Sequence, residues 1–167
     1  MSQMRLYSKT ETWLANLPYI IMVCTGAAVL VLGGKNQTWA WAAAGVYVLY
    51  GIAGALWTMI FICPYCAYYG TRGCPCGYGM LATKLVEKAQ HECFAEKFRK
   101  HIPVIVPLWF IPALAGGWML WRQFDATLAI LLGIFVVDAF VILPFFSRRH
   151  GCSECPQKES CPWMGKS

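Results

Sequence analysis

Four long runs of apolar residues dominate the pattern of hydrophobic and polar positions along the chain. They predict membrane-spanning helices at residues 17–34, 39–62, 102–121 and 126–146. Each run is close to the roughly 20 residues that cross a hydrocarbon core of about 30 Å. Helix is the expected form, because lipid offers no hydrogen-bond partner to the backbone. The sequence therefore predicts an all-α integral membrane protein, a four-transmembrane-helix bundle forming a single membrane domain over residues 1–167.

The composition supports a membrane protein and narrows the functional classes. Hydrophobic residues make up 58% of the 167 residues and charged residues only 13%, about half the charged fraction of a soluble domain. A chain of this length has no room for a second catalytic domain. It carries no G-x-G-x-x-G, P-loop or H-E-x-x-H motif, so neither nucleotide binding nor metal-dependent hydrolysis is indicated.

The positive charges predict the orientation in the membrane. Twelve of the 14 Lys and Arg residues lie in the N-terminal segment, the connection 63–101 and the C-terminal tail. By the positive-inside rule, both termini and this connection are expected in the cytoplasm, and the expected location is the cytoplasmic membrane of a prokaryote. Orientation and an anionic lipid bilayer account for the net charge of +6, so no nucleic acid partner is expected.

Three cytoplasmic segments join or follow these spans. Residues 63–79 are expected to form a Cys-rich loop, and residues 147–167 a Cys-rich C-terminal tail. Between them, residues 80–100 carry apolar positions such as Leu81 and Leu85 among lysines. This pattern predicts an interfacial amphipathic helix at the level of the lipid headgroups.

The cysteines are the strongest indication of chemistry in the sequence. Eight of the nine map to the predicted cytoplasmic face, mostly in one group near residue 70 and another near residue 155. Clustered thiols in a reducing compartment bind metal or perform redox chemistry more often than they form disulfides. We therefore predict that the metal ligands are Cys63, Cys66, Cys74, Cys76, Cys93, Cys152, Cys155 and Cys161.

The spacing of these cysteines fits more than one metal. Four of them precede proline, a step found at the cluster ligands of bacterial ferredoxins. The tail pattern C-x2-C-x5-C from Cys152 to Cys161 resembles part of the auxiliary-cluster segment of SPASM-type radical enzymes. Both features favour an iron–sulfur cluster, with one or two centres. Zinc uses the same thiolate ligands, and redox-active thiols without metal are a third possibility.

The tetrapeptide Cys63-Pro-Tyr-Cys66 is similar to the active site of glutaredoxins. That resemblance implies thiol–disulfide exchange within a thioredoxin-like αβ fold. No βαβ pattern occurs in this chain, and Cys63 follows the end of a helix instead of preceding one. A ligand role is therefore favoured over an exchange role.

Asp138 is the only acidic residue inside a predicted span, about 12 Å from the inner end of that span at 1.5 Å per residue. A charge at this depth is expensive, so the carboxyl is expected to be neutral, paired or beside water. A functional interpretation makes Asp138 a cofactor-binding residue, as a handle for quinone or a proton relay. A structural interpretation makes it a protonated acid that is hydrogen-bonded to a neighbouring helix.

These features together predict a small membrane redox protein that passes electrons from a cytoplasmic donor to quinone or to a membrane subunit. The first alternative is a structural zinc site on a docking or assembly subunit, which would not be an enzyme. The second is a quinone-linked thiol oxidoreductase, similar to four-helix disulfide-generating membrane enzymes. That activity requires cysteines on the outer side, and the two short outer turns contain none.

Overall fold

The chain is helical throughout the part that the structure describes. The computed structural model describes residues 5–35, 37–149, 155–159, 161–162 and 164, and these residues contain no β-strand. Four helical segments are long and apolar enough to cross a membrane, as the sequence predicts. They are Lys9–Gly33, Thr38–Tyr65, His91–Arg122 and Ala126–Ser147.

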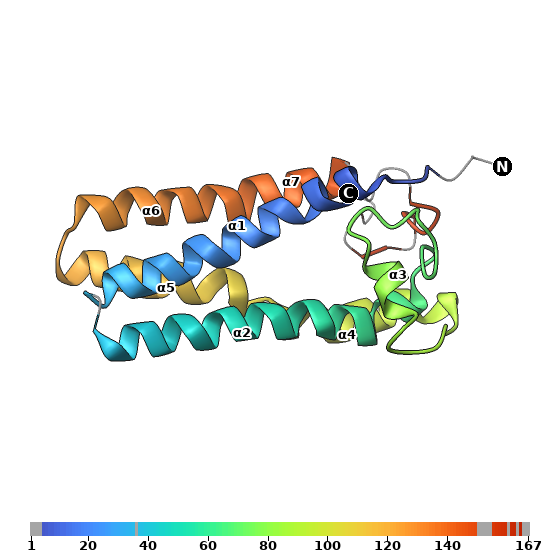
Figure 1. Ribbon diagram of the computed structural model, residues 1–167, viewed down its shortest axis with the longest axis horizontal. Coiled ribbons are helices and arrows are strands. Elements are labelled where there is room, and N and C mark those ends of the chain that lie inside the picture. The colour runs from blue at the N-terminus through green and yellow to red at the C-terminus, as the bar shows by residue number, and fades with distance from the viewer. Residues whose placement is uncertain (1–4, 36, 150–154, 160, 163, 165–167) are drawn as a thin grey trace. The chain divides into compact units, whose positions relative to one another are not determined.

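Seven α-helices and three short helical turns follow one another along the described chain (Figure 1). In order they are α1 (Lys9–Gly33), α2 (Thr38–Phe61), η1 (Cys63–Tyr65), α3 (Tyr78–Ala82), η2 (His91–Cys93), α4 (Phe94–Ile105), α5 (Pro107–Arg122), α6 (Ala126–Val137), η3 (Asp138–Ile142) and α7 (Leu143–Ser147). Helices α5 and α6 are antiparallel and joined by a short turn. Helix α2 and the fourth span each end within a residue of their predicted limits.

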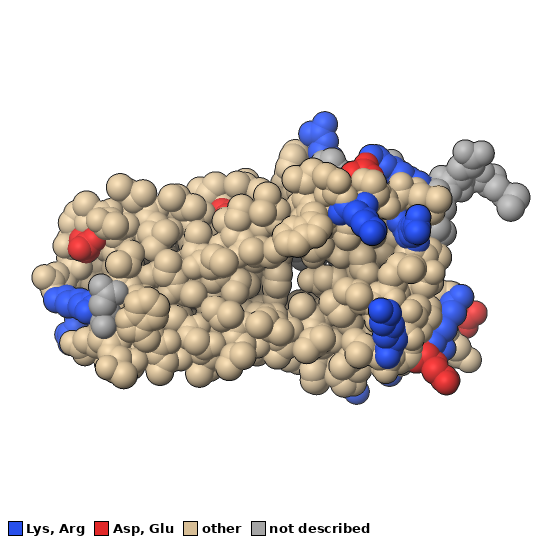
Figure 2. All heavy atoms as spheres, in the orientation of Figure 1, with Lys and Arg blue, Asp and Glu red and all other residues tan. Residues whose placement is uncertain are grey.

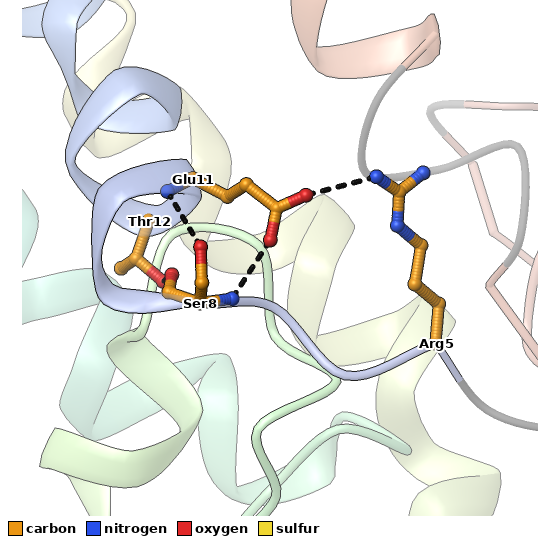
Figure 3. A network of polar contacts seen from close by, with 4 residues as sticks. All are labelled: Arg5, Ser8, Glu11 and Thr12. Atoms are coloured by element: carbon orange, nitrogen blue, oxygen red, sulfur yellow. Dashed lines mark hydrogen bonds and ion pairs between the residues drawn. The ribbon is translucent and has the colours of Figure 1, made fainter.

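Helix α1 begins eight residues before the predicted span because its first turn is capped. The Ser8 hydroxyl accepts a hydrogen bond from the Glu11 amide at 3.2 Å, and the Glu11 carboxylate accepts one from the Ser8 amide at 2.8 Å (Figure 3). This reciprocal pair is a capping box, which satisfies two amides at the open end of a helix. Arg5 adds an ion pair to Glu11 at 2.9 Å.

The predicted interfacial helix over residues 80–100 is wrong in its middle. Helix α3 ends at Ala82, residues 83–90 form turns and extended chain, and α4 begins at Phe94. Long-range hydrogen bonds hold the intervening chain out of a helix. The Ala89 amide donates to the Pro64 carbonyl at 3.0 Å, and the Tyr69 hydroxyl donates to the Val86 carbonyl at 2.5 Å. Tertiary partners of this kind routinely override helix propensity.

The chain divides into two compact units. The cysteine unit comprises Met1–Asn16, Ala55–Val104 and Phe145–Ser167, and the bundle unit comprises Leu17–Gly54 and Ile105–Pro144. Each of the four membrane-length segments contains one boundary between the units, so each unit draws on residues far apart in the sequence.

Proline inside α5 determines one buried hydrogen bond of the bundle unit. Pro112 has no amide, so the Leu108 carbonyl one turn earlier cannot receive its usual helical bond. The buried Tyr47 hydroxyl of α2 donates to that carbonyl at 2.8 Å. In hydrocarbon an unsatisfied carbonyl costs several kcal/mol, so this side chain compensates for the proline and joins α2 to α5.

A second polar contact supports the irregular segment of the fourth span. The π-helix η3 begins at Asp138, and a π-helical turn disturbs the regular pairing of backbone amides and carbonyls. The Trp109 indole of α5 donates to the Ala139 carbonyl at 3.0 Å. An aromatic side chain from a neighbouring helix therefore stabilises the turn that contains the only acid of this span.

Glycine permits close helix packing in the bundle unit. A Cβ atom added to Gly116 would lie 2.7 Å from Cγ1 of the buried Val29 and 3.0 Å from Cδ1 of Leu132. The next residue, Gly117, has nothing within 4 Å of such an atom. Small residues at helix contacts let backbones approach where lipid gives no hydrophobic driving force.

We expect Gly116→Ala to destabilise the protein and Gly117→Ala to leave it unchanged or slightly more stable. Overpacking a buried contact typically costs about 1–3 kcal/mol, whereas alanine is the better helix former at an open position. Thermal unfolding of the two variants in detergent measures this difference. Equal stability would show that Gly116 is not a packing position.

We further expect Tyr47→Phe to destabilise the wild-type background by about 1–3 kcal/mol, the cost of an unsatisfied buried carbonyl. In a Pro112→Ala background the same change should cost less, since the new amide at position 112 can bond to the Leu108 carbonyl. A double-mutant cycle of unfolding free energies measures the coupling. Additive effects would contradict the compensation.

Candidate metal centre

The first cysteine pair lies in a tight turn at the end of α2. Pro64 occupies the start of η1, where its fixed φ favours a helical turn and no amide is needed. The Cys66 amide donates to the Cys63 carbonyl at 3.0 Å and closes the turn. Cys63 is buried and Cys66 is half-buried. The spacing of two residues thus becomes one helical turn, which brings the two thiols into electrostatic contact.

The second pair lies in the turn that precedes α3. The sulfur atoms of Cys74 and Cys76 are 3.5 Å apart, and the Gly79 amide donates to the Cys74 sulfur at 3.4 Å. Gly77 has a φ of 75°, in the left-handed region that favours glycine. A Cβ atom at Gly79 would lie 2.5 Å from the Tyr68 carbonyl oxygen. These two glycines allow the backbone to fold closely around the Cys74 sulfur.

This arrangement stabilises one thiolate in the metal-free protein. A hydrogen bond from the Cys76 thiol, followed by bonds from the Gly79, Cys76 and Gly77 amides, lowers the pKa of Cys74 to about 6. Cys76 retains the shared proton, and its pKa is raised well above the usual value by that bond and by burial. Backbone amides around a sulfur act as an anion-binding nest. Cys74 is therefore a thiolate at neutral pH.

Two other sulfurs of the site, those of Cys66 and Cys155, are protonated at neutral pH in the absence of a cation. Burial is the main cause that raises the pKa of Cys66 to about 12, with further contributions from the charges of Cys74, Cys155 and Cys161. Burial also raises the pKa of Cys155, and Cys161 and Cys74 add to that effect. These mutual interactions place cysteines of the loop and of the tail within electrostatic range of one another.

One glutamine attaches the tail to the loop. The Gln157 side-chain oxygen accepts from the Ala67 amide at 2.8 Å. Its nitrogen donates to the Tyr65 carbonyl at 3.3 Å and to the His91 carbonyl at 3.2 Å. Three backbone groups, two in the first cysteine turn and one in η2, thus bind a residue two positions after Cys155. This contact explains how cysteines about 90 positions apart in the sequence come together.

Apolar packing and the first helix complete the support of the site. Cys161 is buried in a cluster with Ile62 and Phe94, against which Cys66 also packs. On the other side of the loop, the Asn16 amide group of α1 donates to the Cys76 carbonyl at 3.0 Å. The ligands are therefore held by α1, by the end of α2, by α4 and by the tail.

The structure brings together six of the eight cysteines that the sequence nominates. They are Cys63, Cys66, Cys74, Cys76, Cys155 and Cys161, all free thiols. Cys152 lies outside the described residues. Cys93 is half-buried in η2 and is not one of the six. Among the described residues, no three Cys, His, Asp or Glu side chains have the geometry to hold one metal ion, so metal ligation stays a prediction.

Asp138 belongs to the bundle unit and lies at the start of η3. Its side chain is 4% exposed, and its Oδ2 atom has no hydrogen-bond partner among the described residues. The structural interpretation, in which a neighbouring helix satisfies the carboxyl, is not supported at this oxygen. Its role as a cofactor-binding residue stays a prediction.

Several supporting residues could not be recognised from sequence. Gln157 and Asn16 are polar residues with no distinctive motif around them, and their roles depend on which segments meet in space. Gly77 and Gly79 carry a weak signal, since glycine directly after a cysteine pair commonly marks a tight backbone approach. Comparison of the chain with protein-family models, curated proteins and solved structures finds no match.

We expect Gln157→Ala to expose the tail cysteines. Three hydrogen bonds hold this side chain, so their loss should raise the rate of maleimide modification at buried Cys161 by about tenfold or more. Lys158→Ala is the matched control, because the neighbouring Lys158 side chain is exposed. Site-resolved mass spectrometry gives the rates at each cysteine. An unchanged rate at Cys161 would show that Gln157 does not hold the tail.

Proposed function

We propose that this protein is a small membrane redox protein whose cysteine unit binds one or two thiolate-ligated metal centres, with iron–sulfur favoured over zinc. The centre would lie at the cytoplasmic face and relay electrons to quinone or to a membrane partner. One observation carries the proposal. Six free thiols from two remote segments converge in a mostly buried site.

The electrostatics of this site favour a bound cation. Burying several thiols within mutual range raises their pKa values, because each new thiolate would be desolvated and repelled by Cys74. A metal ion or cluster reverses this balance, since a coordinating thiol is deprotonated outright. The same sulfurs are then ligands of the metal and need no other partner.

The surroundings of Cys74 favour a redox centre among thiolate-ligated metals. Amide hydrogen bonds to a ligand sulfur tune the potential of an iron–sulfur cluster, and the Gly79 amide makes such a bond at 3.4 Å. Such a cluster accepts one electron from a soluble donor protein and passes the same electron to an acceptor. Two such transfers, together with two protons from water, reduce a quinone to the quinol.

The charge distribution favours an acidic soluble donor. The four charged residues of the bundle unit cancel, so the whole formal net charge of +6 belongs to the cysteine unit. Figure 2 shows Lys and Arg gathered over the surface of that unit. Lys97 lies over the Tyr65 ring at 5.6 Å, beside the first cysteine pair. Complementary charge of this kind steers encounter between redox partners.

A structural zinc site is the second candidate function, and one distance favours it. Tetrahedral zinc with Zn–S bonds of about 2.3 Å holds its sulfurs about 3.8 Å apart. The Cys74 and Cys76 sulfurs are already 3.5 Å apart. In this case the metal would tie the loop to the tail and present a docking surface, with no electron transfer.

We expect protein purified without oxygen to contain iron and acid-labile sulfide and to absorb broadly near 400 nm, as thiolate-ligated clusters do. Cys74→Ala should remove most of the iron, because Cys74 is the thiolate that the backbone stabilises. Cys24→Ala is the matched control, since Cys24 is an exposed thiol within α1.

Stoichiometric zinc without visible absorption would support the structural alternative and end the redox proposal. Absence of any bound metal, together with fast labelling of Cys155 from outside intact cells by an impermeant maleimide, would instead favour thiol–quinone exchange and reverse the orientation.

A further inference from the structure

Three aromatic rings form a compact cluster within the cysteine unit, close to the first cysteine pair. Trp57 and Phe61 lie one helical turn apart on α2, with ring centroids 4.2 Å apart. His101 of α4 stacks on Phe61 at 4.9 Å with an interplanar angle of 15°, and its centroid is 5.6 Å from that of Trp57. All three side chains are half-buried, so the cluster reaches the surface of the unit.

Two polar groups of this cluster lack hydrogen-bond partners. The indole nitrogen of Trp57 is buried and has no acceptor among the described residues. The same part of the chain provides no hydrogen bond to the His101 ring. A buried donor without a partner is rare in native proteins and calls for an explanation such as a bound ligand. The Trp57 nitrogen is such a buried donor, whereas the neighbouring His101 ring is half-buried.

The position along α2 connects the cluster to the candidate metal centre. Trp57 lies six residues before Cys63, which corresponds to about 9 Å along a helix axis, and Phe61 lies only two residues before it. Any ring bound here would therefore be close to the first ligand pair.

We propose that Trp57, Phe61 and His101 bind the head group of a lipid-soluble quinone. Phe61 and the imidazole offer flat surfaces for stacking a planar ring. The indole and imidazole N–H groups offer donors for its carbonyl oxygens, while the apolar tail remains in lipid. Lys97 and Lys100 act electrostatically on His101, and their positive charge would stabilise the negative charge that a quinone gains when it accepts an electron. As the site of the electron acceptor, this assignment rests on the proposed function.

Binding of heptyl-hydroxyquinoline N-oxide, a fluorescent quinol analogue, tests the site in the purified full-length protein. Quenching of its fluorescence should saturate and be reversed by a short-chain quinone. Trp57→Phe keeps an aromatic ring and removes one donor, so affinity should fall about tenfold. His101→Gln should weaken binding to a similar extent. Trp13→Phe is the matched control, because Trp13 is 69% exposed, and should bind as the wild type does.

Asp138→Asn discriminates between the two candidate quinone positions. Unchanged affinity is expected if the head group lies at the aromatic cluster. Loss of binding in Asp138→Asn, with wild-type affinity in Trp57→Phe and His101→Gln, would overturn the inference and move the quinone to the bundle unit. Failure of the wild type to bind the analogue would also overturn it. Should Trp57→Phe not fold, the His101→Gln variant on α4 decides alone.

Metal and sulfide analysis of the same samples separates this inference from the proposed function. Quinone binding that depends on Trp57 in a protein without redox-active metal would retain the site and reject the relay. An intact iron–sulfur centre whose protein binds the analogue equally well with and without the Trp57 and His101 changes would retain the relay and reject the site.

Discussion

The cost of gathering sulfur atoms away from water is the constraint on which the rest of the site depends. A buried thiol stays protonated at little cost. Ionising a further thiol beside an existing thiolate costs free energy through desolvation and through repulsion between the two charges. The described residues offset this cost most fully at Cys74, where several amide groups and a neighbouring thiol surround the sulfur, whereas Cys66 and Cys155 each receive one backbone hydrogen bond. For the remaining sulfurs the protein provides few such donors, and positive charge from a metal would supply what the backbone does not.

Support for these sulfurs comes from polar contacts to the backbone. The side chains of Asn16 and Gln157 form these hydrogen bonds with carbonyl or amide groups of the loops, and the bonds do not use the sulfur atoms as partners. Such contacts fix the path of the chain without competing for the ligands. The arrangement follows a general feature of metal sites, in which groups beyond the ligands determine ligand orientation.

Much of the architecture could be predicted from sequence, because long apolar runs have few structural solutions in a membrane. The end of α2 and the limits of the fourth span follow from hydropathy. Residues 83–90 did not follow their local pattern, since partners such as Pro64 and Tyr69 are distant in sequence and outweigh a modest apolar stripe.

The cysteines of the site could be nominated from their spacing, whereas the hydrogen bonds of Gln157 could not, because nothing local distinguishes that glutamine. The sequence does not indicate Trp57 and His101 either, because their rings come into contact only in the folded protein.

The hydrogen bonds of Gln157 have a consequence for the order in which the site is assembled. The loop cysteines and the first helix that supports them leave the ribosome long before the tail, so the early product has only an open half of the ligand set. Cys155 and Cys161 complete it. Incorporation of an inorganic centre would thus require synthesis to have passed Cys161, and a chain that stops before this residue would insert into lipid yet never mature.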